Sequence, residues 1–146
     1  NLVNSLSKNS SLIMSMAFWH AFGSVSTIFL RETGDDSTSA DPVRASAVVG
    51  LLAGLLMEDK SAALALYAGS FAGMSLPSRL MNQSKTVFPI TSTQSVTKLS
   101  LLLSFAISGA IGGMIHGALI TFEWWPGGWG GKAGLCSFLG CLIFRG

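Results

Sequence analysis

The chain is 146 residues long, the length of one ordinary domain. Hydrophobic residues make up 49% of it and charged residues only 11%, whereas soluble domains carry about 25% charged residues. The net charge of +2, without any run of Lys or Arg, argues against a nucleic-acid-binding protein. The low charge predicts a single integral membrane domain over residues 1–146.

The first hydrophobic segment covers residues 11–30 and contains no formal charge. Twenty helical residues rise about 30 Å, which is enough to cross the apolar core of a bilayer. This predicts a membrane span, with an amphipathic helix packed on a partner as the alternative. Residues 1–30 also lack acids and are rich in serine, as organelle transit peptides are, but contain no arginine. We therefore expect a processed mature chain, and a chain trimmed at this end fits equally well.

A solvated loop is predicted over residues 31–41, which hold four of the seven acidic residues together with Gly and Ser. Asp41 followed by Pro42 is typical of a helix start, because an N-cap acid precedes a proline at the first helical position. We therefore expect a helix over residues 42–57.

The polar residues at 58–61 interrupt the apolar pattern, and Ser61 is the expected cap of a further helix over 61–76. This helix and its predecessor are short for a full span, so together they predict a tight hairpin. The hairpin either crosses a thin region of the bilayer or re-enters it beside neighbouring helices. The sequence leaves both possibilities open.

Residues 78–98 are polar and are expected to form an exposed connection. Residues 99–122 follow as 24 uncharged residues, the strongest candidate span in the chain. A last apolar helix is expected over 131–144, too short to span without help. Together the segments predict an all-α, polytopic membrane protein with about three to five hydrophobic helices. Basic residues place the loops at 31–41 and 78–98 on the cytosolic, stromal or matrix side.

Glycines at four-residue spacing occur in three of the predicted helices. Residues four apart lie on one face of a helix, and small residues at this spacing let two helix backbones approach closely. A second small stripe, Ser104, Ser108 and Gly112, lies beside the last of these faces. The alternative is that glycine is simply common in membrane helices. The glycines expected to mediate helix packing are Gly50, Gly54, Gly69, Gly73, Gly109, Gly113 and Gly117.

His20 and His116 are the only histidines, and both lie inside candidate spans. Ionisable residues at such depth are candidate functional groups. Counting helical rise from the same side places His20 about 13 Å and His116 about 9 Å deep. Three hypotheses follow: a haem held by both imidazoles, a chlorophyll magnesium bound by either one, or hydrogen bonding to a neighbouring helix. Space for a macrocycle would come from the neighbouring Gly117 or Ala21.

The tryptophan-rich stretch "EWWPGGWGGKAG" lacks the spacing of a nucleotide-binding loop. Aligning Gly131 and Lys132 on a P-loop puts Pro126 in place of its first glycine and Ala133 in place of its hydroxyl residue. No nucleotide partner is therefore predicted. A dinucleotide fingerprint fails too, because an apolar helix and not a strand precedes the glycines.

Aromatic residues directly after a long apolar run are typical of a membrane–water interface. We therefore predict that Trp124, Trp125 and Trp129 anchor the chain there. Cys136 and Cys141 point about 140° apart on a helix, and no His or acid lies near them in sequence. The two cysteines are expected to act as small apolar residues, and no metal site is predicted. No catalytic residues are predicted either, so the chain is not expected to be an enzyme.

The segments "YAGSFAGMS" and "GGWGGKAG" resemble a pattern found in uncharacterised small bacterial and plastid membrane proteins, with a GSFxGM-like core. The overall profile is similar to the small accessory subunits of algal photosystem supercomplexes. The resemblance implies a non-catalytic subunit in the plastid thylakoid that touches chlorophyll and carotenoid, with photosystem I and its antenna as host.

The expected partners are larger membrane-protein subunits and lipids. A mitochondrial respiratory complex in the inner membrane is the second choice of host. The competing hypothesis is a small channel or transporter, because short, broken helices are a feature of such proteins.

Overall fold

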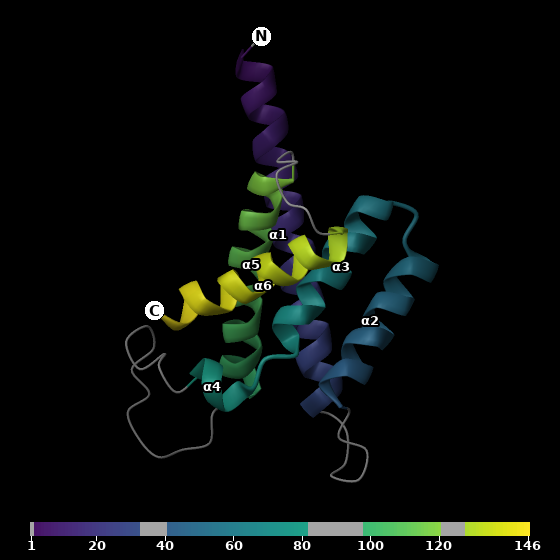
Figure 1. Cartoon of the computed structure of the whole chain (residues 1–146), viewed down its shortest axis with the longest axis vertical. Helices are drawn as coiled ribbons and strands as arrows, with labels where there is room; N and C mark the ends of the chain where they lie inside the picture. The colour runs from purple at the N-terminus through teal and green to yellow at the C-terminus, as the bar shows by residue number, and fades with distance from the viewer. Residues whose placement is uncertain (1, 33–40, 82–97, 121–127) are drawn as a thin grey trace.

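The computed structural model describes residues 2–32, 41–81, 98–120 and 128–146 (Figure 1). Of these residues 91% are helical and none lies in a β-strand, which confirms the predicted all-α fold. The helices are α1 (Leu2–Glu32), α2 (Pro42–Leu56), α3 (Lys60–Gly73), α4 (Pro77–Met81), α5 (Lys98–Leu119) and α6 (Trp129–Arg145).

Helix α1 is the centre of the bundle and contacts α5, α3 and α2. It runs antiparallel to α5, while the hairpin of α2 and α3 lies on its other side (Figure 1). Helix α6 crosses α5 at a steep angle and touches both α5 and α3. The end of α1, the starts of α2 and α5, and the whole of α4 lie together at the lower end of Figure 1. We call this end of the bundle the α4 end.

Helix α1 extends well before the predicted range of 11–30. Residues 2–10 contain neither glycine nor proline, so nothing in them stops the helix. The next helix begins at Pro42 as predicted, and the Asp41 carboxylate accepts a hydrogen bond from the backbone N–H of Val43 at 3.1 Å.

The predicted cap of α3 was wrong. Asp59, and not Ser61, occupies the cap position, and its carboxylate accepts from the backbone N–H of Ser61 at 2.8 Å. The helix therefore begins at Lys60. A charged carboxylate at a helix N-terminus also interacts favourably with the helix dipole, which favours Asp59 over a neutral hydroxyl.

Helix α3 ends at Gly73, three residues before the predicted end. Arg31 donates hydrogen bonds to the carbonyl oxygens of Gly73 and Ser75, both at 2.9 Å, so it pairs acceptors that the end of a helix leaves open. Pro77 then begins α4, because a proline is tolerated in the first turn of a helix but cannot continue one. Beyond α4, the predicted connection up to residue 97 lies outside the described residues.

Two helices in the described part of the chain are long and apolar enough to cross a membrane. They are Asn9–Glu32 and Lys98–Leu119. Helix α2, with 15 residues, rises only about 22 Å at 1.5 Å per residue. Helix α6 begins at Trp129, two residues before its predicted start, and is also shorter than a full span.

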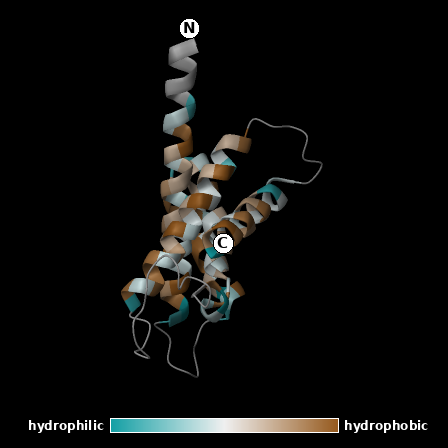
Figure 2. Ribbon diagram, turned by 90° about the vertical axis from the view of Figure 1, so that its left-hand side faces the viewer, coloured by the Kyte–Doolittle hydropathy of each residue, from teal (hydrophilic) through white to brown (hydrophobic). Residues whose placement is uncertain are grey.

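Large apolar side chains lie on the outside of the bundle, and its interior holds buried polar residues beside two apolar clusters, one around Phe105 and one around Leu66. Leu55 and Leu56 are 72% and 76% exposed, whereas His20 and Ser24 are 0% exposed. In Figure 2 the hydrophobic colour runs along the helices and the hydrophilic colour lies mostly near helix ends. The buried polar residues are His20, Ser24, Thr27, Ser46, Ser70, Ser104, Ser108, His116 and Ser137.

Serine hydroxyls connect helices inside this interior. The Oγ atoms of Ser46 in α2 and Ser70 in α3 lie 2.6 Å apart. Ser137 of α6 donates to the backbone carbonyl of Ala68 in α3 at 2.7 Å. Short polar side chains that bond across helices, with small residues around them, are typical of helix packing in membranes.

Candidate functional site: a buried histidine pair between glycine faces

His20 of α1 and His116 of α5 meet in the middle of the bundle. Both side chains are 0% exposed. His20 Nε2 and His116 Nδ1 lie 2.9 Å apart, and the ring planes are inclined at 78° with centroids 5.1 Å apart. The two imidazoles are therefore hydrogen-bonded directly to each other.

The chemistry of imidazole fixes what the pair presents to its surroundings. One ring must donate an N–H and the other must accept it with a lone pair, so the accepting ring is neutral. In a neutral pair the outer nitrogens, His20 Nδ1 and His116 Nε2, are then one donor and one acceptor, whichever way the shared proton points. Neither outer nitrogen has a hydrogen-bond partner among the described residues.

A serine and a tryptophan lie next to the histidine pair. Ser24, one turn after His20 on α1, is fully buried, and its Oγ has no described hydrogen-bond partner. On the other side, the ring of Trp129 at the start of α6 contacts His116 edge-on, with centroids 4.8 Å apart. An unpaired buried polar group costs about 1–3 kcal/mol, so each of these three open atoms lowers the stability of the bundle.

Glycines make the short distance between the two histidines geometrically possible. A Cβ atom placed on Gly113 of α5 would lie 2.8 Å from the Cβ of His20, and one placed on Gly109 would lie 2.8 Å from its carbonyl oxygen. Gly69 of α3 lies against the same carbonyl group of His20 as Gly109 does. The turn of α1 that carries His20 is thus enclosed by glycines from two helices.

The other predicted glycines lie in different surroundings. Gly117 faces the Cα atom of Ile13, and Gly73 faces Ser24 and Thr27, so both lie against α1. Gly50 lies under the ring of Tyr67 of α3.

Gly54 makes no close packing contact with the described residues, so its predicted packing role stays a prediction. A Cβ atom placed on Gly54 would meet no described atom within 4 Å. Gly54 is exposed one turn after Gly50, where no described residue covers this face of α2.

Sequence spacing missed two glycines at close helix contacts. Gly23 of α1 lies against the backbone of Leu66, and Gly140 of α6 lies against the backbone of Ser108 and Gly112. Neither has another glycine four residues away. Gly140 does follow Cys136 by four residues, so counting cysteine as a small residue would have marked this side of α6 as a packing face.

The haem hypothesis does not fit this arrangement. A metal–imidazole bond is about 2 Å long, so two histidines on opposite sides of one metal need nitrogens about 4 Å apart with a macrocycle between them. The two nitrogens lie 2.9 Å apart, with no macrocycle-sized space between their helices. Single-histidine ligation of chlorophyll stays a prediction: both rings are fully buried in the chain alone, and Gly117, one of the two residues expected to leave space for the macrocycle, lies against Ile13.

The remaining candidate residues are placed as follows. Trp129 is 37% exposed and reaches inward to His116, while Trp124 and Trp125 lie outside the described residues. Burial raises the pKa of the Cys136 and Cys141 thiols, so both are expected to stay protonated at neutral pH. Among the described residues, no three His, Cys, Asp or Glu side chains gather in a way that could hold a metal ion.

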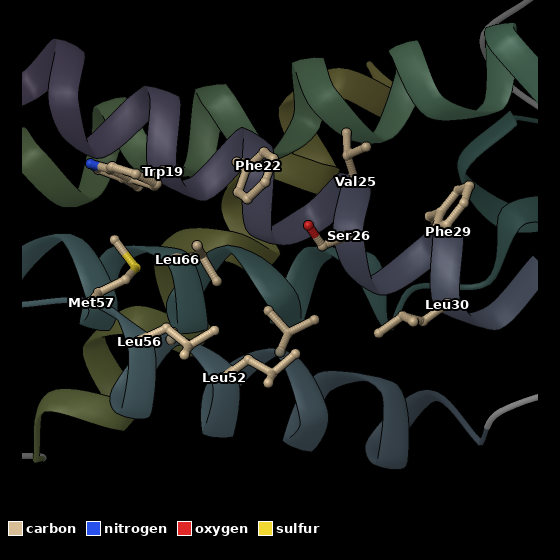
Figure 3. A pocket seen from close by; sticks show the side chains of 12 residues that line it. Trp19, Phe22, Val25, Ser26, Phe29, Leu30, Leu52, Leu56, Met57 and Leu66 are labelled. Carbon is tan, nitrogen blue, oxygen red and sulfur yellow. The ribbon is translucent and has the colours of Figure 1, made fainter.

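An apolar groove lies between α1 and α2 on the outside of the bundle and has a volume of about 530 Å³. Figure 3 shows Trp19 and Phe22 of α1 on one side and Leu52 and Leu56 of α2 on the other. Ser26 is the single hydroxyl residue of its lining. The sequence did not predict this groove, because it depends on how far α2 stands from α1.

Comparisons of the chain with family models, with curated proteins and with solved structures gave no match.

Proposed function

We propose that the chain is an integral membrane protein that acts as a non-catalytic accessory subunit and packs against larger membrane-protein subunits. The observation that carries this proposal is the inverted distribution of side chains. The outward faces of α1, α2, α5 and α6 carry large apolar side chains, and the interior carries serines, histidines and glycines as well as buried apolar residues such as Phe105.

Apolar side chains on the outside of a bundle are more favourable in contact with lipid than in contact with water. Soluble proteins rarely expose contiguous apolar patches of more than a few hundred Å², whereas the outer face of α2 alone exposes Val48, Leu51, Leu52, Leu55 and Leu56. In a bilayer, contact between such side chains and the lipid acyl chains carries no free-energy penalty. The driving forces for helix association there are close packing of small residues and interhelical hydrogen bonds, both of which occur in this bundle.

The groove between α1 and α2 supports the accessory role. Its volume of about 530 Å³ lies within the ~300–1,000 Å³ typical of binding sites, and its walls are almost wholly apolar. In our proposal, apolar side chains of a helix from a larger subunit fill it from the outer side. The host complex follows from the sequence resemblance alone, which points to photosystem I with its antenna in the plastid thylakoid.

Native gel separation of gently solubilised membranes, followed by mass spectrometry, tests this function. We expect the chain to stay in the membrane after a carbonate wash and to migrate with a complex much larger than itself. A Ser26→Phe variant fills the groove and should release the chain from that complex. The matched control is Ala47→Phe, which makes the same kind of enlargement on the exposed face of α2, outside the groove.

Three outcomes would contradict the proposal. The chain would leave the membrane in the carbonate wash, or it would migrate alone or as a homo-oligomer, or Ser26→Phe would behave like Ala47→Phe. A homo-oligomer that also gives ion or solute flux in liposomes would support the small channel or transporter instead.

A further inference from the structure

The ring of Trp129 forms part of the cover over the unpaired end of the histidine pair. The His116 side chain is 0% exposed, and its Nε2 atom has no hydrogen-bond partner among the described residues. Trp129, the first residue of α6, contacts this ring edge-on at a centroid distance of 4.8 Å and is itself 37% exposed. The position of the first turn of α6, residues 129–132, therefore decides whether the surroundings of the bundle reach His116.

This first turn is built more weakly than the starts of α2 and α3. The carboxylates of Asp41 and Asp59 cap those two helices, whereas Gly128 at the cap position of α6 offers no side-chain hydrogen bond. Gly130 lies inside the turn and Gly134 follows it. A glycine inside a helix is less favourable than an alanine, because its backbone loses more conformational freedom. A Cβ atom placed on either glycine would meet no described atom within 4 Å, so no close contact in the described structure requires them.

The rest of α6 is anchored to the bundle independently of its first turn. Ser137 donates to the backbone carbonyl of Ala68 in α3 at 2.7 Å, and Gly140 lies against the backbone of α5. The first turn is attached through a side chain, because Lys132 Nζ donates to the carbonyl oxygen of Leu119 at 3.1 Å. Leu119 ends α5 at the end of the bundle opposite the α4 end (Figure 1). The first turn can thus separate from α5 without breaking the contacts of Ser137 and Gly140.

We propose that the first turn of α6 is a lid, which opens while the rest of the helix stays packed and lets water reach His116 Nε2. Segments with few buried contacts open at a lower free-energy cost than the core does. Hydrogen bonding of water to the uncovered nitrogen offsets part of that cost, since an unpaired polar atom is unfavourable inside the bundle. The lid gives the bundle controlled access to a buried imidazole, a property that goes beyond the accessory role proposed above.

Acylation of histidine by diethyl pyrocarbonate tests the lid, because this reagent modifies an imidazole nitrogen that it can reach. The full chain in detergent is treated briefly, and mass spectrometry of its peptides gives separate rates for His20 and His116. We expect His116 to react faster, at a rate that follows the population of the open lid. Gly130→Ala should slow this reaction about two- to fivefold by favouring the closed helix, and Trp129→Ala should speed it about two- to tenfold by removing part of the cover. The matched control is Gly54→Ala, the same change at an exposed glycine of α2 that likewise meets no described atom.

Three results would overturn the lid. Equal rates for His20 and His116 would mean that the whole bundle opens, and not the first turn of α6. Unchanged rates in both Gly130→Ala and Trp129→Ala would show that this turn does not control access to His116. An equal slowing in Gly54→Ala would show that helix stability in general sets the rate. Each of these results leaves the proposed accessory role standing, because that role is measured by migration with a larger complex.

Discussion

Gly109 and Gly113 on α5 and Gly50 and Gly54 on α2 share the same four-residue repeat, yet the two regions are built differently. On α5 both glycines lie against the backbone of α1, close enough that an added Cβ would collide with it. On α2 the first glycine lies under the ring of Tyr67 and the second faces open space.

The difference shows what the repeat does and does not specify. Four-residue spacing makes one face of a helix smooth, but the position of the helix in the bundle decides whether that face is covered. Helix α5 lies beside the central helix along its length, whereas α2 contacts the bundle through one side and turns Leu51 and Leu55 outward. The seam between α1 and α5 is therefore a folding determinant, and the outer face of α2 is a surface.

The largest difference in the free energy of unfolding is expected between a leucine placed at a covered glycine of α5 and a leucine placed at an exposed glycine of α2. Gly113→Leu would force α5 away from Met16 and Ala17 of α1, and overpacking of this kind costs about 1–3 kcal/mol or more. Gly54→Leu should change the free energy of unfolding by no more than about 0.5 kcal/mol. Thermal unfolding in detergent, followed by circular dichroism, measures both. Equal effects of the two substitutions would remove the distinction between seam and surface.

An intermediate effect is expected from the histidine pair within the seam. His20→Phe or His116→Phe alone leaves a buried imidazole nitrogen without its partner, at a cost of about 1–3 kcal/mol. The double substitution should cost less than the sum of the two, with a coupling of about 0.5–3 kcal/mol. A double-mutant cycle on unfolding free energies measures this coupling. Strict additivity would show that the imidazoles do not bond to each other.

The smallest effect is expected where α2 joins the bundle. Ser70 donates to the carbonyl of Tyr67 at 2.6 Å, so Ser46 is the donor in the contact between the two serines. Ser46→Ala removes that bond but leaves Ser70 with a partner, and such bonds in membranes are worth about 0.6 kcal/mol on average. The same unfolding assay measures it. A loss above about 2 kcal/mol would mean that α2 depends on this contact as strongly as α5 depends on its glycines.

Much of the fold could be predicted from the sequence because apolar runs and helix caps are local signals. Asp41 and Pro42 marked a helix start, and the uncharged run after Lys98 marked α5. The cap at Asp59 was missed because two polar residues in one turn competed for the position, and only the backbone geometry chooses between them. The crossing of α6 over α5 is a tertiary property that no local pattern encodes.

The candidate site could be predicted in part. Counting helical rise placed His20 and His116 at similar depth on neighbouring helices, and in the structure they meet. The sequence could not show whether the imidazoles bond each other or hold a metal between them. That depends on an ångström of separation between α1 and α5, which Gly109 and Gly113 allow to be small.

The hydrogen bond between His20 and His116 joins residues 96 positions apart, and this has a consequence for how the protein is made. Chains grow at about 5–20 residues per second, so His20 is synthesised roughly 5–20 s before its partner exists. During that interval the His20 imidazole has no counterpart from its own chain, and in the proposed membrane location little water would be available to replace it. The proposed membrane location therefore requires that another hydrogen-bonding group pairs with His20 until the second long helix has been made.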